Sequence, residues 1–123
     1  HLDDNAKALK YSKLSLELKT PEEGKGYGIS LYNVGRAYDA LGKFKEALHY
    51  YQDAEPYFHS KTPRDTYQKS VLQLNIGLAM VQSDQSASRT ILNNAVASLQ
   101  KKEFSVYLTT AIKERLALAV NLL

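Results

Sequence analysis

Residues 31–54 read LYNVGRAYDALGKFKEALHYYQDA, and this stretch decides the fold. On both sides of the pair Leu41-Gly42, apolar residues return every three or four positions, which is the spacing of one face of an α-helix. A glycine directly after the last apolar position of a helix can adopt the left-handed conformation that closes it. The stretch therefore predicts two helices with a tight turn between them, and a short connection makes neighbouring helices antiparallel.

Small residues at matching places predict that these two helices lie close together. Gly35 has no side chain, and Ala47 and Ala54 are the small residues of the second helix. Tyr38 and Tyr51 are large enough to fill the remaining space between the helices. A glycine inside a helix costs roughly 1 kcal/mol relative to alanine, so close packing is the natural reason for Gly35.

Helical spacing of apolar residues continues through almost the whole chain, and no stretch alternates apolar and polar residues as a half-buried strand does. We expect six helices, near residues 3–18, 21–41, 44–59, 63–82, 85–101 and 103–122. The pairs Thr20-Pro21, Thr62-Pro63 and Ser83-Asp84 supply side-chain caps at helix starts, and Glu23 can complete a capping box with Thr20. The fold class is therefore all-α, built of antiparallel helix hairpins.

The sequence repeats itself at intervals of about 40 residues. The segment 8–11, ALKY, aligns with 47–50, ALHY, at an offset of 39 positions. The segment 31–35, LYNVG, aligns with 73–77, QLNIG, at an offset of 42, and Ala117 lies 40 positions beyond Gly77. Gly35, Gly77 and Ala117 therefore mark equivalent helices of successive two-helix units.

The pattern Leu31-x-x-Val34-Gly35-x-x-Tyr38, continued through Ala47, Tyr51 and Ala54, resembles the signature of the tetratricopeptide repeat family. The second unit departs from that signature because Met80 replaces the tyrosine. The resemblance implies a right-handed superhelical solenoid in which the first helix of each unit lines the concave face. The unit is longer than the usual ~34 residues, and in this it is similar to the repeats of peptide-sensing bacterial regulators of the Rap and PlcR type and of kinesin light chains.

The register of the repeat predicts a single tetratricopeptide-like domain over residues 1–123 that is a piece of a longer array. Residues 1–20 form the second half of a unit, 21–61 a full unit, 62–102 a degenerate unit, and 103–123 the first half of another. An array without polar capping helices exposes apolar faces at its ends. We therefore expect that the terminal helices can join copies of the chain into a homo-oligomer.

The helix register places a set of side chains on the concave face. If Val34 and Tyr38 face the paired helix, the positions turned toward the groove are Ile29, Tyr32, Asn33, Arg36 and Asp39, then Val71, Leu74, Asn75, Leu78 and Val81, then Ala111, Glu114, Arg115, Leu118 and Asn121. The second of these three sets is mostly apolar, so a neighbouring element can cover it instead of a ligand.

Five of these residues are our candidate peptide-binding residues: Tyr32, Asn33, Arg36, Asn75 and Arg115. Asn33 and Asn75 each precede an aliphatic residue and the packing glycine, and an amide can both donate to and accept from a peptide backbone. The alternative is that the two amides hydrogen-bond to neighbouring helices and fix their register. Arg36 and Arg115 can pair with a carboxylate or serve as surface charges, and Tyr32 is an amphipathic aromatic suited to a binding surface.

Chaperone-binding members of the family hold a carboxylate with a clamp of Lys, Asn and Arg. Asn75 and Arg115 match two of its positions. Tyr32, Arg36 and Ala111 stand where Lys, Asn and Lys would be expected, and this departure argues against that clamp.

Composition excludes several other functions. The chain has no cysteine, which rules out disulfides and thiolate sites. Its three histidines have no metal spacing, and its net charge of +3 is spread among acidic residues rather than gathered for nucleic acid. Gly24-x-Gly26-x-Gly28 follows a helix cap rather than a strand, so it predicts a flexible or tightly packed helix start and not a phosphate loop. We expect no catalysis, cofactor or metal, and no membrane span.

The sequence therefore predicts a protein- or peptide-binding scaffold, cytoplasmic, and in its sharper form the sensor of a bacterial peptide-responsive regulator. The alternative is a structural assembly module that contacts its partners by the convex face or the ends, without a peptide groove.

Overall fold

The computed structural model describes residues 2–123, and all its regular structure in that range is helical. Six α-helices follow one another: α1 (Leu2–Glu17), α2 (Lys25–Ala40), α3 (Phe44–Ala54), α4 (Pro63–Met80), α5 (Gln85–Leu99) and α6 (Thr110–Leu122). Three short 3-10 segments lie between them: η1 (Pro21–Glu23), η2 (Glu55–Tyr57) and η3 (Lys102–Tyr107). The predicted all-α helical repeat fold is confirmed. The chain divides into two compact units, residues 1–58 and residues 59–123.

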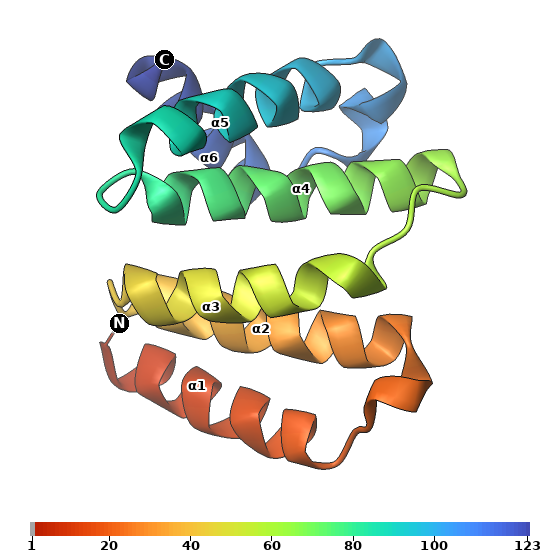
Figure 1. Cartoon of the computed structure of the whole chain (residues 1–123), viewed down its shortest axis with the longest axis vertical. Helices are drawn as coiled ribbons and strands as arrows, with labels where there is room; N and C mark the ends of the chain where they lie inside the picture. The colour runs from red at the N-terminus through yellow and green to blue at the C-terminus, as the bar shows by residue number, and fades with distance from the viewer. Residues whose placement is uncertain (1) are drawn as a thin grey trace. The chain divides into compact units, whose positions relative to one another are not determined.

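In the first unit, α2 packs against α1 on one side and against α3 on the other (Figure 1). Ala47, Tyr51 and Ala54 of α3 are fully or almost fully buried, as is Val34 of α2. A Cβ atom placed on Gly35 would lie 2.6 Å from the ring of Tyr51 and 3.3 Å from the carbonyl oxygen of Ala47. Since a contact of 2.6 Å is too short for a carbon atom, the close packing of Tyr51 explains the glycine at this position, as the sequence predicts.

In the second unit, α4 and α5 lie side by side as the next hairpin, and α6 packs against both (Figure 1). Their shared core consists of Val71, Leu74, Leu92, Ala95, Val96, Leu99, Leu116 and Ala119. Gly77 repeats the packing of Gly35, since a Cβ there would lie 2.6 Å from the Leu92 side chain. The hydroxyl of Ser88 donates to the carbonyl oxygen of Gly77 across 2.7 Å, which fixes α5 against α4 at this point.

Side chains cap the helix starts as predicted. The backbone N–H of Thr20 donates to Glu23 Oε2 at 2.8 Å. The hydroxyl of Thr62 accepts from the N–H of Asp65 at 3.1 Å, and the carboxylate of Asp84 accepts from the N–H of Ala87 at 3.0 Å. These bonds satisfy N–H groups that the first turn of a helix leaves without a partner.

Two expected helices are shorter than predicted because a particular residue interrupts each. The capping box at Thr20 begins the 3-10 turn η1, and Gly24 then adopts φ +63°, so α2 begins only at Lys25. The helix expected over 44–59 ends at Ala54 and continues as the 3-10 turn η2, which contains Pro56. Proline has no N–H to donate and disfavours helix in the residue before it.

The single helix expected over 103–122 is wrong. Residues Lys102–Tyr107 form η3, the backbone is extended at Leu108 and Thr109, and α6 begins at Thr110. The hydroxyl of Thr109 accepts from the N–H of Ile112 at 3.2 Å and so caps a new helix. Leu108, which lies within the predicted range 103–122, packs against the core from its place before α6. The predicted division into repeats and their superhelical twist stay predictions.

Candidate functional site

The outer side of α2, which is the side of this helix that is exposed to solvent, carries three of the five predicted binding residues. Val34 and Gly35 are buried, whereas Asn33 and Arg36 are exposed and Tyr32 is half-buried. Ile29, one turn earlier, is also exposed, at 37%. An amide, a guanidinium, an aromatic ring and an apolar side chain therefore lie on successive turns of the same helix.

Ring contacts hold Tyr32 in place. Its ring centroid lies 5.7 Å from that of Tyr51 and 6.1 Å from that of Phe58, both of which are buried. The guanidinium carbon of Arg36 lies 5.9 Å from the centre of the Tyr32 ring, within the range of a cation–π contact. Tyr32 therefore links the charge of Arg36 to the buried core of the first unit.

Asp39 uses its carboxylate inside the hairpin. The hydroxyl of Tyr51 donates to Asp39 Oδ2 across 2.8 Å. Tyr51 is only 1% exposed, so this bond supplies its buried hydroxyl with an acceptor. Asp39, which the sequence predicts to face the groove, therefore accepts a hydrogen bond that joins α2 to α3.

In the second unit the two remaining predicted residues lie against each other. Arg115 of α6 donates from Nε to Oδ1 of Asn75 on α4, across 2.6 Å. Asn75 is 2% exposed and Arg115 is partly buried. The bond is of the kind that fixes helix register, which is the alternative that the sequence left open for Asn75. Binding of a peptide by these two residues stays a prediction.

The apolar residues predicted to face the groove of the second unit belong to its core instead. Val71 and Leu74 are buried in the core that α4 shares with α5 and α6, and the partly buried Leu78 and Val81 pack against the same cluster. The physical reason is that these four side chains are large and apolar. Burying them stabilises the folded chain more than leaving them exposed to water. The equivalent positions of α6 are different, because Glu114, Leu118 and Asn121 are exposed.

An aromatic contact on the other edge of the first hairpin was not predicted. The rings of Tyr38 and Tyr50 stack at 5.6 Å, and the Lys13 ammonium of α1 lies 5.2 Å from the centre of the Tyr38 ring. Hydrogen bonding to Tyr38 raises the pKa of Lys13 from its ordinary value. The presence of tyrosine at both 38 and 50 is the sequence signal of this contact, since Lys13 lies far away in the chain.

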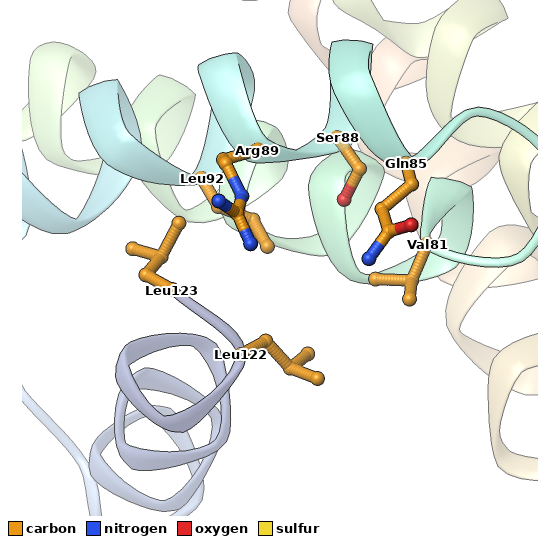
Figure 2. Close-up of a pocket in the computed structure, with 7 residues that line it drawn as sticks. All are labelled: Val81, Gln85, Ser88, Arg89, Leu92, Leu122 and Leu123. Atoms are coloured by element: carbon orange, nitrogen blue, oxygen red, sulfur yellow. The ribbon is translucent and has the colours of Figure 1, made fainter.

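A small open depression lies where the ends of α4, α5 and α6 meet, and Figure 2 shows the side chains around it. Its lining residues are Val81, Gln85, Ser88, Arg89, Leu92, Leu122 and Leu123. Ser88 already donates to Gly77, so only Gln85 and Arg89 offer polar groups, and both are exposed. The depression has too few convergent polar groups for a ligand site.

The described residues contain no group of three or more His, Cys, Asp and Glu side chains that could hold a metal ion. None of the helices in residues 2–123 has the length and apolar character needed to cross a membrane. His1, one of the three histidines without metal spacing, lies outside the described residues.

Comparison with known proteins addresses the first unit. Residues 1–58 match the family model described as the tetratricopeptide repeat. No curated protein and no solved structure matches the chain. Proteins of that family are typically interaction scaffolds without catalytic activity, so the match supports a protein-interaction role. The hairpin in which Gly35 lies against Tyr51 falls within the residues that match this family model.

Proposed function

We propose that the chain is a protein- or peptide-binding scaffold and that the outer side of α2 is its binding surface. The observation that carries the proposal is the arrangement of Arg36, Tyr32 and Asn33 on that helix. Asn33 is exposed, and Arg36 lies over a ring that two buried aromatic side chains hold in place. Side chains that are already ordered lose less conformational entropy when a ligand binds.

These three groups suit an extended segment with an acidic residue. The Asn33 amide can donate to a peptide carbonyl and accept from a peptide N–H at the same time. The Arg36 guanidinium can pair with a carboxylate through two parallel hydrogen bonds. Ile29 and the edge of Tyr32 add apolar contact beside the polar groups. The surface thus offers backbone recognition, one charge contact and a hydrophobic contact.

The sharper form of the proposal is the sensor domain of a bacterial peptide-responsive regulator. Its support is the ~40-residue interval between equivalent positions, which is similar to the repeats of such regulators. In this form, peptide binding would change the superhelical pitch of the array and its contact with an output domain. In the second unit, Asn75 and Arg115 would have to exchange their mutual hydrogen bond for bonds to the peptide.

The second candidate function is structural assembly through the ends or the convex face, without a peptide groove. The bond between Arg115 and Asn75 favours it, because two of the five candidate residues contact each other and not solvent alone. The two functions differ in their dependence on α2: only peptide binding requires the side chains of Asn33 and Arg36.

The test selects peptides from a random library displayed on phage, using the whole 123-residue chain, and measures their dissociation constants by fluorescence anisotropy. We expect Asn33→Ala and Arg36→Gln each to weaken binding of the selected peptides about 3- to 10-fold, which corresponds to the loss of one net hydrogen bond. The matched controls are Asn93→Ala and Arg64→Gln, which alter exposed residues of the second unit. Unchanged dissociation constants for both α2 variants, at unchanged helicity, contradict the peptide-binding proposal.

A further inference from the structure

The exposed side chains of α2 follow one another in a row whose spacing is known. Ile29 is 37% exposed, and Asn33 and Arg36, four and seven positions later, are exposed as well. An α-helix rises about 1.5 Å and turns about 100° per residue, so Arg36 lies nearly in line with Ile29 and about 10.5 Å farther along the axis. Asn33 lies between them and about 40° to one side. An apolar, an amide and a cationic group therefore stand in a fixed order.

The two polar groups of this row keep their hydrogen-bonding capacity. Within residues 2–123, Arg36 forms no ion pair with a carboxylate, and the Asn33 amide forms no hydrogen bond. Asp39, the next acidic residue along α2, accepts from the hydroxyl of Tyr51. The contact of Arg36 with the ring of Tyr32 is a cation–π contact, which leaves guanidinium N–H groups able to donate.

The amide of Asn33 favours a ligand whose backbone is extended. A helical ligand pairs its own N–H and C=O groups with each other, so it offers few of them to an amide. An extended segment in the polyproline II conformation has no internal hydrogen bonds. Its backbone can therefore accept from the Asn33 amide and donate to it at the same time.

The distance between Ile29 and Arg36 then selects among extended conformations. In a β-strand, side chains on the same face are about 6.6 Å apart at two positions and about 13 Å apart at four. In a polyproline II segment, every third side chain returns to the same side, after about 9.3 Å. This spacing is the nearest to the roughly 10.5 Å of the row, and the long arginine side chain can cover the remainder.

We infer that the ligand of α2 is a polyproline II segment with an apolar residue three positions away from an acidic one. The inference rests on the proposed function of this surface. Ile29 contacts the apolar side chain, Arg36 pairs with the carboxylate, and Asn33 holds the backbone between them. A segment that already favours this conformation loses little entropy on binding, and Tyr32 likewise keeps Arg36 in place.

The test uses short peptides blocked at both ends, each with one leucine and one glutamate among alanine and proline residues. The two side chains are two, three or four positions apart, in either order, and a further alanine-based helical peptide carries them seven apart. NMR titration of the isotope-labelled 123-residue chain measures each dissociation constant. We expect a value on the order of 0.1–1 mM for the three-position peptides and binding about 3- to 10-fold weaker for all others.

Charge reversal identifies the residue that meets the acid. Arg36→Glu should lose the preference for the three-position glutamate peptide and regain it when that glutamate is replaced by lysine. Arg64→Glu, at an exposed position of α4, is the matched control and should leave every dissociation constant unchanged. Lys25→Gln examines the other exposed cation of α2 and should have less than about a twofold effect.

Asn33→Ala separates this inference from the proposed function, because it should weaken all the extended peptides equally and leave the helical peptide unaffected. Equal affinity at all spacings, tighter binding of the helical peptide, or failure of the lysine peptide to bind Arg36→Glu overturns the inference. So does a loss with Lys25→Gln as large as that with Arg36→Glu. In each case the proposed function stands if peptides selected from the library still depend on Asn33 and Arg36, and it fails together with the inference if they do not.

Discussion

Arg115 and Asn75, which are 40 positions apart in the chain, are joined by a hydrogen bond of 2.6 Å from Nε to Oδ1. The bond ties α6 to α4 at a place where Asn75 is almost entirely buried. An amide and a guanidinium suit the recognition of a peptide, and the same chemistry suits a contact between helices. Their structural contribution can be measured separately from binding.

Asn75→Ala should lower the stability of the fold. The substitution removes one acceptor of the Arg115 guanidinium, a charged donor at a partly buried site, so we expect a loss of about 1–3 kcal/mol in the free energy of unfolding. Urea unfolding followed by circular dichroism measures it. Asn93→Ala, on an exposed position of α5, should change stability by less than ~0.5 kcal/mol. Equal effects of the two substitutions would mean that the bond contributes nothing.

Gly35→Ala should destabilise the first hairpin although alanine favours helix. The new Cβ would lie 2.6 Å from the Tyr51 ring, and Tyr51 is buried and also hydrogen-bonded to Asp39. Overpacking of a filled core costs about 1–3 kcal/mol, which exceeds the ~1 kcal/mol that alanine adds as a helix former. The urea midpoint of the variant should therefore fall.

Gly26→Ala is the matched control in the same helix and should have the opposite sign. The nearest atom to a Cβ at Gly26 is Lys19 Nζ, at 4.0 Å, so the methyl group meets ordinary space. We expect a gain of about 0.5–1 kcal/mol from helix propensity and the reduced entropy of the unfolded chain. If Gly35→Ala also raised the midpoint, the close approach of Tyr51 to Gly35 would be refuted.

Thr109→Ala should destabilise the start of α6. The Thr109 hydroxyl accepts from the N–H of Ile112, and loss of such a cap costs about 1 kcal/mol. Thr109→Ser keeps the hydroxyl and should retain most of the stability. Hydrogen exchange of the first N–H groups of α6, compared for the two variants, localises the effect. Exchange at the same rate in both would show that the cap is dispensable.

The second unit should lose stability in alkaline solution through Tyr67. Its hydroxyl donates to the carbonyl oxygen of Tyr107 at 3.1 Å, and its ring lies 5.8 Å from that of Phe104. Burial raises the pKa of Tyr67 above its ordinary value of 10.0. Below that value the phenol is protonated in both the folded and the unfolded chain. As the pH rises past it, the unfolded chain loses its proton first, so the stability contribution of the neutral phenol disappears.

Tyr67→Phe isolates this effect. The variant lacks the hydroxyl, so its urea midpoint should fall less than that of the wild type between about pH 9 and about pH 11. At neutral pH it should be less stable than the wild type, since the Tyr107 carbonyl loses its donor. If the urea midpoints of the two proteins fell equally at alkaline pH, the loss of stability would come from tyrosines other than Tyr67.

The sequence predicts the hairpins well because their signals are local. The turn at Gly42, with φ +75°, and the caps at Thr62 and Asp84 are formed by residues within a few positions of one another. Gly35 and Gly77 are also predictable, since a helical glycine that repeats in register needs a packing reason. Periodicity alone could not detect the interruption at Thr109, because Leu108 continues the apolar spacing of α6 from outside the helix.

The candidate site is less predictable because its residues have two uses. A register assigns Asn33 and Asn75 to the same kind of position, yet one amide is exposed and the other is buried beside Arg115. The difference depends on which side chain the next helix supplies, and that partner lies 40 positions away. Val71 and Leu74 illustrate the same limit, since they are buried in a core to which both α5 and α6 contribute.

The short sequence separation of the hairpin contacts has a consequence for synthesis of the chain. Tyr51 and Asp39 are 12 positions apart, and Ser88 and Gly77 are 11. Closing such short loops loses little chain entropy, and folds rich in local contacts form quickly. Each hairpin can therefore assemble on the ribosome soon after its second helix emerges, before the rest of the polypeptide has been translated.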